Sequence, residues 1–530
     1  MKDLRVKLIS LPNMGSWFIY DQFILPYGLG ILANFLKEKN YRVTLDDISI
    51  KIEDNHRKFL FPSMQRIDID MLQPNNSRVI DYLSNNNYND DNNKKIGRLA
   101  EQLISVASCE GYDVIGISVF SYLQILPALL LSKKLKSMSA VKIVLGGSYI
   151  TLNGEEIFSS YPFIDYIIIG DGQIPFIRLL EHLEGRIPIE NVPSLIYRHN
   201  GSIRHNTREF LSIEELSIPN FSDLPLEIYR SDKRNKQVIL PYQVTRGCPY
   251  NCSFCNMKFI TPSVELKSHE KVTREIKIMR ERYKSNAFNF RDEAMNYSYE
   301  YLDEFCDNLV ENNLNIQWSM CVRPDNLDMP ILRKMKKAGC VFLWFGLESG
   351  SNRILKNINK GFTIEQASGV LKNAYELGIV NNVFLITGYP YEREEDIDET
   401  INFIKTHSKY ITSHPALIRL HIDRGAPLYT YPEKFGIENL RIINKLGLIY
   451  TFDEINGLKG KDKVKQQFHS YRKVLKACFK YIDQRTIRIN VLPFWIYLLM
   501  RDKSHWSWYV RLLRRLLRCL KRKKYERLQG

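Results

Sequence analysis

The sequence predicts an α/β protein with two parallel β-sheets in succession, followed by a helical C-terminal region. Short apolar segments alternate with amphipathic helical segments across residues 4–183, and six further strand–helix alternations run across 237–430. Near-continuous apolar strands separated by helices are typical of parallel sheets that helices cover on both faces. We therefore expect a doubly wound sheet first and a partial parallel barrel second.

The N-terminal block covers residues 1–183. Between 51 and 112 its alternation breaks, and the asparagine-rich run from 74 to 95 is expected to be a surface insertion without regular structure. Residues 184–236 contain four prolines and little periodicity, so we expect them to link the two blocks. The expected strands are 4–11, 42–48, 113–120, 142–145 and 166–169, and the expected helices are 28–39, 126–136 and 174–183.

The second block covers residues 237–430, and from 431 to 530 the chain is expected to be mostly helical. Chemistry in a parallel barrel takes place at the carboxyl ends of its strands, so polar residues there are candidate site residues. The expected strands are 238–246, 287–293, 316–322, 341–347, 383–389 and 417–423, and the clearest helices are 268–284, 298–312 and 363–377.

The strongest chemical signal is a cluster of three of the nine cysteines, Cys248, Cys252 and Cys255, on a Gly-Pro loop after the first barrel strand. Iron–sulfur clusters usually take four thiolates. Three thiolates leave one iron open, which is typical of a reacting metal centre. The alternatives are chance spacing and a zinc knuckle, but no histidine or cysteine lies between Cys255 and His269 to complete a zinc site. One such site in a chain with an odd number of cysteines favours a reducing compartment.

The pattern CxxxCxxC, with Phe254 before the third cysteine, resembles the radical SAM superfamily. Segments 290–294, 322–361 and 385–393 resemble later stretches of that family in the same order, so the resemblance covers about 237–430. It implies a partial (β/α)6 barrel in which the three cysteines hold a [4Fe–4S] cluster. It also implies that the open iron binds S-adenosylmethionine (SAM).

The same resemblance implies the residues that contact SAM. Asp292 and Glu293 would lie near its amino group, and Glu348 would approach its ribose and methionine parts. At 391 the chain has tyrosine where the family motif has glycine, so the adenine side departs from the pattern. The alternatives are that Glu348 caps the following helix and that Asp292 is an ordinary loop acid. The expected SAM contacts are Phe254, Asp292, Glu293, Arg323, Glu348, Ser349 and Gly388.

A doubly wound domain before such a barrel resembles the cobalamin-dependent radical SAM family. Segments 25–48, 113–123, 143–151 and 165–180 carry this resemblance, which implies a Rossmann-like cobalamin-binding domain. The bland alternative is that its glycines and serines belong to tight turns and packing in any Rossmann-like domain. The expected cobalamin contacts are Ser118, Ser121, Gly146, Gly147, Ser148, Gly170 and Gly172.

Two departures from related patterns concern cobalamin. Asp171 and Gln173 replace both acids of the family's Gly-Glu-Gly-Glu motif. The loop 13–17 lacks the histidine of the Asp-x-His-x-x-Gly pattern through which some cobalamin proteins ligate cobalt. We therefore expect no histidine ligand to cobalt.

The net charge of +16 is concentrated at the C-terminus, where residues 501–530 carry +9. Residues 505–528 predict a basic amphipathic helix, which either packs on the body, contacts the inner face of a membrane or binds an acidic partner. The remaining +7 makes nucleic acid an unlikely partner. No signal peptide is evident, and the longest apolar run, 491–500, is shorter than the ~20 residues that span a bilayer. We expect a cytoplasmic protein.

The resemblance implies a cobalamin-dependent radical SAM methyltransferase. Such an enzyme forms a 5′-deoxyadenosyl radical and transfers a methyl group from methylcobalamin to an unactivated carbon or to a phosphinate phosphorus. Its substrate would be a natural product, lipid or peptide, and its electron donor a flavodoxin or ferredoxin.

Three alternatives remain. The first is a cyclase, ring-rearrangement or oxidation enzyme of the same family without net methylation. The second is a methylthiotransferase, which is disfavoured because only Cys109 precedes Cys248. The third is a non-enzymatic protein with a structural cluster.

Overall fold

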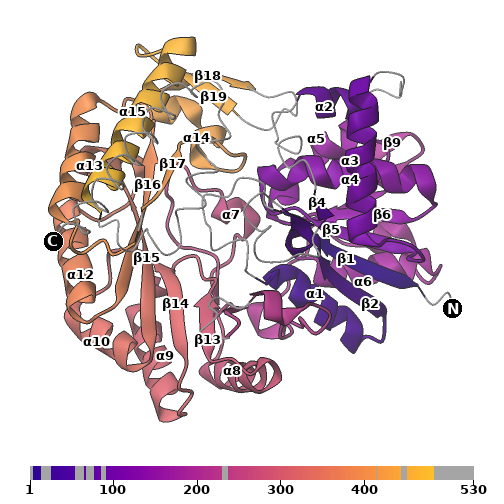
Figure 1. Cartoon of the computed structure of the whole chain (residues 1–530), viewed down its shortest axis with the longest axis horizontal. Coiled ribbons are helices and arrows are strands. Elements are labelled where there is room, and N and C mark those ends of the chain that lie inside the picture. The colour runs from indigo at the N-terminus through magenta and orange to yellow at the C-terminus, as the bar shows by residue number, and fades with distance from the viewer. Residues whose placement is uncertain are drawn as a thin grey trace, which may run out of the picture.

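The computed structural model describes residues 4–12, 25–53, 65–66, 77–84, 91–229, 237–413, 415–442 and 450–482. These residues form two lobes that lie side by side, an N-terminal lobe in indigo to magenta and a C-terminal lobe in red to yellow (Figure 1). The loop 13–17, the apolar run 491–500 and the basic segment 505–528 lie outside the described residues. Within the described part, no helix has the length and apolar character needed to cross a membrane.

The N-terminal lobe contains a seven-stranded sheet in the order β2-β1-β5-β6-β7-β8-β9. The first five strands of this order run parallel, and β8 and β9 are antiparallel. Because β1 pairs with β2 on one side and β5 on the other, the chain reverses direction across the sheet there, and ligands of such sheets bind beyond the carboxyl ends. The strands are β1 (Arg5–Ser10), β2 (Arg42–Asp47), β5 (Val114–Ser118), β6 (Lys142–Gly146), β7 (Tyr166–Ile168), β8 (Leu195–His199) and β9 (Ser202–His205).

Helices cover both faces of this sheet, which confirms the doubly wound class. Alternate residues of β6 show why: Val144 belongs to one apolar core, whereas Ile143 and Leu145 belong to another. Helices α1 (Tyr27–Glu38) and α6 (Gln173–Leu183) contribute to the first core, and α4 (Ile125–Met138) and α5 (Ser148–Ser160) to the second.

The prediction that 74–95 lacks regular structure is wrong in part. Helices α2 (Ser77–Ser84) and α3 (Asp91–Ala107) pack against α4. Buried Val79, Ile80 and Leu83 in α2 have helical spacing, as do Ile96, Leu99 and Leu103 in α3. This apolar spacing outweighs the asparagine-rich composition.

The expected linker is also more structured than its prolines suggested. Strands β8 and β9 form a hairpin that extends the N-terminal sheet. Its two-residue turn is Asn200-Gly201, and both residues have positive φ, 48° and 75°. Asn-Gly is the preferred sequence for this turn, so the signal was present in the sequence.

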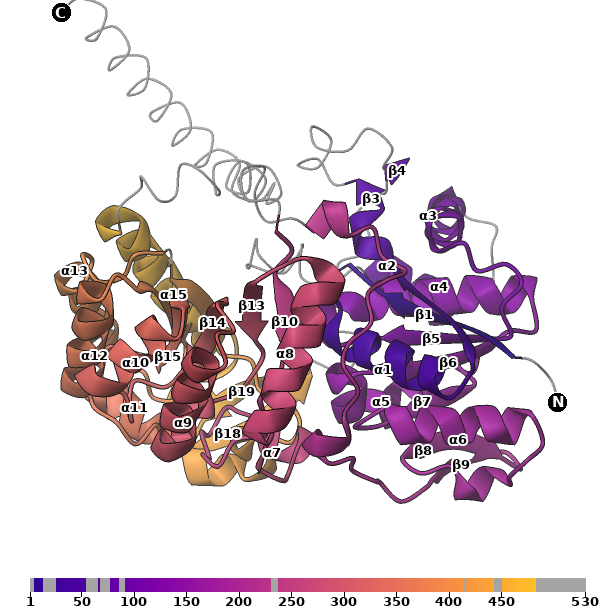
Figure 2. The same ribbon diagram turned by 90° about the horizontal axis from the view of Figure 1, so that it is seen from below.

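The C-terminal lobe confirms the partial barrel of six parallel strands, in the order β10-β13-β14-β15-β16-β17. Helices α8 (His269–Tyr283), α9 (Tyr299–Glu311), α10 (Met329–Lys337), α12 (Ile364–Glu376) and α13 (Glu394–Thr406) lie along its outside (Figures 1 and 2). The strands are β10 (Leu240–Tyr242), β13 (Ala287–Phe290), β14 (Gln317–Val322), β15 (Cys340–Glu348), β16 (Val380–Thr387) and β17 (Ala416–Arg419).

Beyond residue 430 the prediction of a mostly helical region is wrong for 437–454. Strands β18 (Ile437–Ile442) and β19 (Tyr450–Glu454) form an antiparallel pair before helix α15 (Gly460–Tyr481). Helix α15 packs against α13 and β17. The pair is short and mixes polar with apolar residues without regular alternation, so it gave neither a continuous apolar run nor a period of two to detect.

Candidate functional site

The three-cysteine loop lies between two short strands, β11 (Thr245–Arg246) and β12 (Glu265–Leu266), which pair in antiparallel fashion. Gly247 has a φ of +75°, and a Cβ atom added to it would overlap the carbonyl oxygen of Ser263. Glycine is therefore required where the chain enters the loop. Helix α7 (Met257–Ile260) follows Cys255 and lies between the two lobes in both views (Figures 1 and 2).

Ser253 holds the loop against the barrel through both its backbone and its side chain. The Ser253 N–H donates to the carbonyl oxygen of Ile358 at 2.8 Å, and the Ser253 hydroxyl lies 2.6 Å from the Tyr389 hydroxyl. Cys252 is buried, and Cys248 and Cys255 are half-buried. All three thiols are free of disulfides, so they are available as ligands.

The chemistry of the three cysteines fits an iron–sulfur cluster. Burial raises the pKa of the Cys255 thiol to about 12, and it also raises that of Cys248. Such thiols are inert unless a metal binds them, because a coordinated thiol is deprotonated. Among the described residues, no three His, Cys, Asp or Glu side chains converge on a single ion. A cluster does not require this convergence, because each thiolate binds a different iron.

A fixed positive charge lies beside the cysteine loop. Arg323 Nη1 is 3.9 Å from Cys252 Sγ, and the guanidinium carbon lies 3.5 Å from the centre of the Tyr250 ring. Asp325 orients the guanidinium by accepting from Nε at 2.8 Å and from Nη2 at 2.9 Å. Arg323 was expected to contact SAM, and it lies at the end of β14 next to a cluster cysteine.

Two buried carboxyl groups follow β13. Asp292 Oδ1 accepts the backbone N–H groups of Val244, at 3.0 Å, and Thr245. Asp292 Oδ2 and Glu293 Oε2 are buried and have no hydrogen-bond partner within the described part of the chain. Unpaired buried oxygens are costly, so they indicate that a ligand completes them.

The electrostatics of this pair favours a cationic ligand. Burial raises the pKa of Asp292 to about 6. Burial and the neighbouring Asp292 raise the pKa of Glu293 to about 8. Both shifts arise because burial disfavours the negative forms more than the nearby cations Lys267 and Arg246 favour them, and an ammonium group would offset the remainder. The two oxygens therefore fit the amino group of an amino acid-like cofactor.

Glu348 ends β15 in an unusual conformation, with a φ of +68°. Non-glycine residues in this left-handed region are uncommon and cluster at functional sites. Its carboxylate forms a buried ion pair with Lys360, with Oε1 3.1 Å from Nζ. Ser351 occupies the N-cap of the following helix α11 (Asn352–Ile358), so the alternative that Glu348 caps this helix is wrong.

Ser349, which was expected beside Glu348 in the SAM site, has partners within the protein. Its hydroxyl accepts the N–H of Ser351 at 3.1 Å and lies 3.3 Å from the Thr400 hydroxyl on α13. These bonds fix the turn between β15 and α11. Ser349 thus has a clear structural role.

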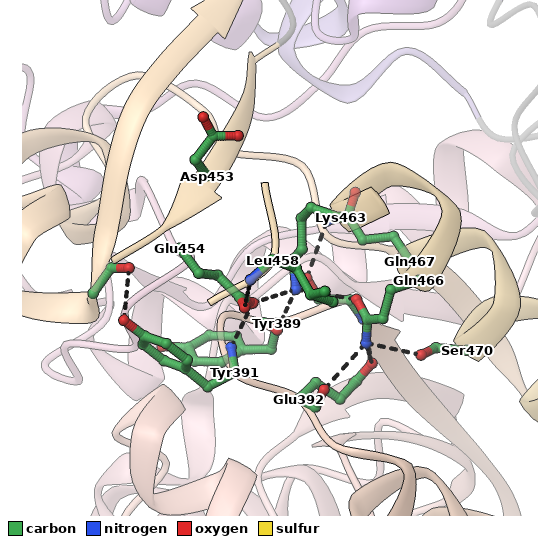
Figure 3. A network of polar contacts seen from close by, with 12 residues as sticks. Tyr389, Tyr391, Glu392, Asp453, Glu454, Leu458, Lys463, Gln466, Gln467 and Ser470 are labelled. Atoms are coloured by element: carbon green, nitrogen blue, oxygen red, sulfur yellow. Dashed lines mark hydrogen bonds and ion pairs between the residues drawn. The ribbon is translucent and has the colours of Figure 1, made fainter. Parts of the chain in front are cut away.

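The loop after β16 departs from the family motif at Tyr391, and the structure gives the reason. Tyr391 has a φ of +55°, the left-handed conformation that glycine adopts readily. Its N–H donates to Glu454 Oε1 at 2.7 Å, and its hydroxyl donates to the carbonyl oxygens of Gly436 and Ile455 (Figure 3). The tyrosine keeps the turn while tying it to the β18–β19 pair.

A buried lysine at the start of α15 completes this network. Lys463 Nζ lies 2.7 Å from Glu454 Oε1 and donates to the Tyr389 carbonyl oxygen at 3.1 Å (Figure 3). Gly388, an expected SAM contact, is held on both sides: its N–H donates to Glu392 Oε2 at 2.8 Å, and its carbonyl accepts from Gln467 at 3.0 Å. The C-terminal segment therefore fixes the carboxyl end of β16.

Replacing Lys463 by methionine is expected to destabilise the barrel lobe by about 3–5 kcal/mol, because Glu454 would keep a buried charge without its cation. The measurement is denaturant-induced unfolding of the full chain. The matched control is Lys459→Met, since the Lys459 side chain is 60% exposed in its pair with Glu438. Equal losses in the two variants would contradict the assigned role.

The expected cobalamin contacts gather at one edge of the N-terminal sheet. Ser118 is in register with both Ser10 and Gly146, so the carboxyl ends of β1, β5 and β6 are adjacent. Several of these residues also have ordinary structural partners. A Cβ on Gly147 would lie 2.6 Å from the Val119 carbonyl oxygen, and Ser148 donates to the carbonyl oxygen of Phe120 at 3.2 Å.

The remaining three expected contacts are Ser121, Gly170 and Gly172. Ser121 accepts the Leu123 N–H at 3.3 Å and so caps a short helix. Gly170, with a φ of +77°, donates its N–H to the Thr151 hydroxyl at 2.9 Å. Gly172 is the N-cap of α6. The two glycines lie in the loop after β7, at the same edge of the sheet.

Sequence reasoning missed an ion pair that joins the two lobes. Arg246 ends β11, directly before the cysteine loop, and its Nη1 lies 3.0 Å from Asp171 Oδ2 and 2.6 Å from the carbonyl oxygen of Leu211. Asp171 was identified only as a departure from an acidic motif. The chain positions are 75 apart, so no local pattern links them. The ion pair between Lys360 and Glu348 was also missed.

A cavity of about 150 Å³ lies next to this site. Phe254 of the cysteine loop and Tyr122 of the N-terminal lobe both line it, so it lies between the lobes. Residues from the ends of β16 and β17 complete its walls. The lining residues are Tyr122, Phe254, Ile386, Ile418, Leu420, His421, Ile422 and Asp423.

Comparison with known proteins concerns the family of the barrel lobe and the fold of the chain. Residues 242–404 match the family described as the radical SAM superfamily. Over 269 residues the chain is 29% identical to the uncharacterized methyltransferase PH0819 of Pyrococcus horikoshii, covering 50% of this chain and 58% of that one. Over 264 residues it is 28% identical to the anaerobic magnesium-protoporphyrin IX monomethyl ester cyclase of Rubrivivax gelatinosus, covering 48% and 47%. The chain thus spans about half the length of these relatives.

The fold of the whole described chain has a counterpart among solved structures. The cobalamin-dependent SAM radical enzyme OxsB, with aqua-cobalamin and SAM bound, superimposes with a TM-score of 0.62 at 17% identity, covering 98% of this chain and 75% of OxsB. This likeness concerns the fold and includes both lobes. Residues 242–404 therefore form a radical SAM domain, and the chain has the two-domain fold of the cobalamin-dependent radical SAM enzymes.

Proposed function

We propose that this chain is a cobalamin-dependent radical SAM methyltransferase that acts on an unactivated carbon. One observation carries the proposal: the three-cysteine loop and the unpaired oxygens of Asp292 and Glu293 occur in the same chain as a doubly wound lobe, tied to it by Arg246 and Asp171. When bound, the cluster supplies the electron that cleaves SAM, and the corrinoid carries the methyl group to be transferred. Two similarities support this assignment: the sequence similarity to a protein named as a methyltransferase, PH0819, and the fold similarity to the cobalamin-dependent enzyme OxsB.

In this proposal the residues bind and orient rather than react. Cys248, Cys252 and Cys255 hold three irons, and Arg323 supplies a fixed positive charge beside them. Asp292 and Glu293 accept hydrogen bonds from the amino group of SAM. Glu348, fixed by Lys360, would contact its ribose and methionine parts, and Phe254, Ser349 and Gly388 would line the same site.

The crevice at the carboxyl ends of β1 and β5 would hold the corrinoid. Ser118 and Gly146 lie side by side there, and Ser121, Gly147, Ser148, Gly170 and Gly172 lie in the loops around them. A topological switch point of this kind is where doubly wound sheets bind nucleotide-like groups. The absence of a histidine ligand to cobalt stays a prediction, because part of that crevice lies outside the described residues.

The test is anaerobic reconstitution with iron, sulfide and hydroxocobalamin, followed by incubation with SAM and a reduced flavodoxin or ferredoxin. We expect retained corrinoid, and both 5′-deoxyadenosine and S-adenosylhomocysteine as products. The first product reports radical formation, and the second reports methyl donation by SAM. A protein that forms 5′-deoxyadenosine but retains no corrinoid would overturn the cobalamin part of the proposal.

The similarity to a cyclase supports a second candidate, a radical SAM enzyme of the same fold without net methylation. The two candidates differ in stoichiometry. A methyltransferase forms one S-adenosylhomocysteine for each methylated product, whereas a cyclase forms none. The methylated atom, carbon or phosphinate phosphorus, and the class of substrate, natural product, lipid or peptide, stay predictions, as does membrane contact through 505–528.

A further inference from the structure

The cavity between the lobes combines an apolar wall with two polar side chains. Isoleucine, leucine, phenylalanine and tyrosine side chains form most of the wall, and His421 and Asp423 are the polar exceptions. Both follow β17 at the carboxyl end of the barrel, where substrates of parallel barrels bind. A dry apolar cavity of about 150 Å³ is large enough to bind benzene, so this one suits a single ring or a short branched chain.

Neither polar side chain is satisfied by the protein. No hydrogen bond or ion pair joins the His421 ring or the Asp423 carboxylate to another described side chain or backbone group. The ring centres of His421 and Tyr122 lie 6.0 Å apart. Asp423 is exposed to solvent although protein surrounds it, which is the situation of a group that lines a cleft. Both are therefore available to a ligand.

Their charge states at neutral pH follow from their surroundings. Burial, and secondarily the positive charge of Arg419, lower the pKa of His421 to about 4, so the imidazole is neutral. The protein around Asp423 withdraws part of its hydration although the side chain still reaches solvent. This raises the pKa of the carboxyl group to about 6, so the carboxylate is mostly ionised. The cavity therefore presents one negative charge and one neutral hydrogen-bonding ring.

The charged and titratable groups near Asp423 leave this negative charge unneutralised. Arg424 forms an ion pair with Glu156 and donates to the Tyr450 hydroxyl at 3.0 Å. Arg419 stacks on Phe468, with its guanidinium carbon 3.9 Å from the ring centre. Burial, and secondarily the negative charge of Asp423, raise the pKa of the Tyr149 phenol, so this side chain stays neutral. Asp423 faces solvent, so a cationic ligand would replace water as the partner of its carboxylate.

We infer that the substrate of this enzyme carries a protonated amine, which Asp423 binds, next to an apolar group that fills the cavity between the lobes. The inference rests on the proposed function, because it treats this cavity as the substrate site. A carboxylate or phosphate at this position would be repelled by Asp423. A neutral hydroxyl would leave the carboxylate without compensating charge, so it binds more weakly than an ammonium group. His421 supplies a second hydrogen bond to the same polar end.

The experiment compares three small probes of similar size that differ in charge: 2-phenylethylamine, 2-phenylethanol and 3-phenylpropionate. Their binding to the reconstituted full chain is measured by isothermal titration calorimetry at neutral pH. We expect the amine to bind about tenfold or more tightly than the alcohol, and the propionate to bind weakest. In Asp423→Asn the amine and the alcohol should bind alike. Asp462→Asn, which removes an exposed carboxylate on α15, should keep the preference.

Equal binding of amine and alcohol to the unmodified chain would overturn the inference, and so would a preference for the propionate or an amine preference that survives Asp423→Asn. Corrinoid uptake and SAM cleavage, measured on the same unmodified preparation, report the proposed function separately. If these fail while the amine preference depends on Asp423, the proposed function is wrong and the cavity is an amine site of another activity. If they succeed without an amine preference, only the substrate class is wrong.

Discussion

Replacing Cys252 by alanine is expected to reduce SAM cleavage by at least about 10⁴-fold, the scale seen when a group on which the chemistry depends is removed. Cys252 is the most buried of the three loop cysteines, and its sulfur lies 3.9 Å from Arg323. Without it only two thiolates remain, and no other cysteine of the described chain lies in the loop. Cluster loss is measured from iron and sulfide content, and cleavage from 5′-deoxyadenosine.

The matched control is Cys306→Ala, which removes a buried thiol from α9, on the outside of the barrel. This variant should retain iron, sulfide and SAM cleavage. The same experiment separates the alternative functions. If Cys252→Ala still cleaves SAM, Cys252 is not a ligand of the reacting cluster. If the unmodified protein binds the cluster but does not cleave SAM, the cysteines form a structural site, and the non-enzymatic interpretation of the sequence is favoured. Metal analysis that finds zinc in place of iron would contradict the cluster assignment.

The features that the sequence predicted correctly are those written in local patterns. The alternation of apolar strands with helices depends on periods of two and 3.6 residues, so both sheets were predictable. The cysteine loop was predictable because its three ligands lie within eight residues. Helix α2 and the β8–β9 hairpin were missed although their signals were local. In both cases our prediction gave more weight to the asparagine and proline composition than to the apolar spacing of α2 and the Asn-Gly turn of the hairpin.

The features that were missed in the site depend on contacts between distant parts of the chain. Arg246 and Asp171 form an ion pair across the two lobes. Tyr391 stands where the family has glycine, and its backbone N–H donates a hydrogen bond to Glu454 at the end of the β18–β19 pair. The packing of the helices and strands determines which of these residues meet. The spacing of residues along one sequence does not reveal that packing. The same holds for the unpaired oxygen of Asp292, since it becomes evident only when all neighbouring donors are placed.

Replacing Glu293 by glutamine is expected to have opposite effects on stability and on SAM binding. Burial, and then the charge of Asp292, raise the pKa of Glu293 from its ordinary value of 4.5 to about 8. Between these values the folded state holds a proton that the unfolded state has lost. The contribution of Glu293 to stability is therefore lost as pH rises from about 4.5 to 8, by up to about 1.4 kcal/mol per pH unit.

Glutamine does not titrate, so Glu293→Gln should gain stability over the unmodified protein as pH rises from 5.5 to 8.5 in the absence of SAM. The measurement is thermal unfolding of both proteins at the two pH values, with Glu311→Gln, an exposed site on α9, as control.

SAM binding should weaken about tenfold or more in Glu293→Gln, because the ammonium group of SAM loses a charged acceptor. A stability difference that does not change with pH would contradict the burial of an ionisable Glu293. SAM affinity equal to that of the unmodified protein would show that the free oxygen serves another ligand. The combination of higher stability at alkaline pH and weaker binding is expected only if the cost of the buried carboxylate is offset by the cofactor itself.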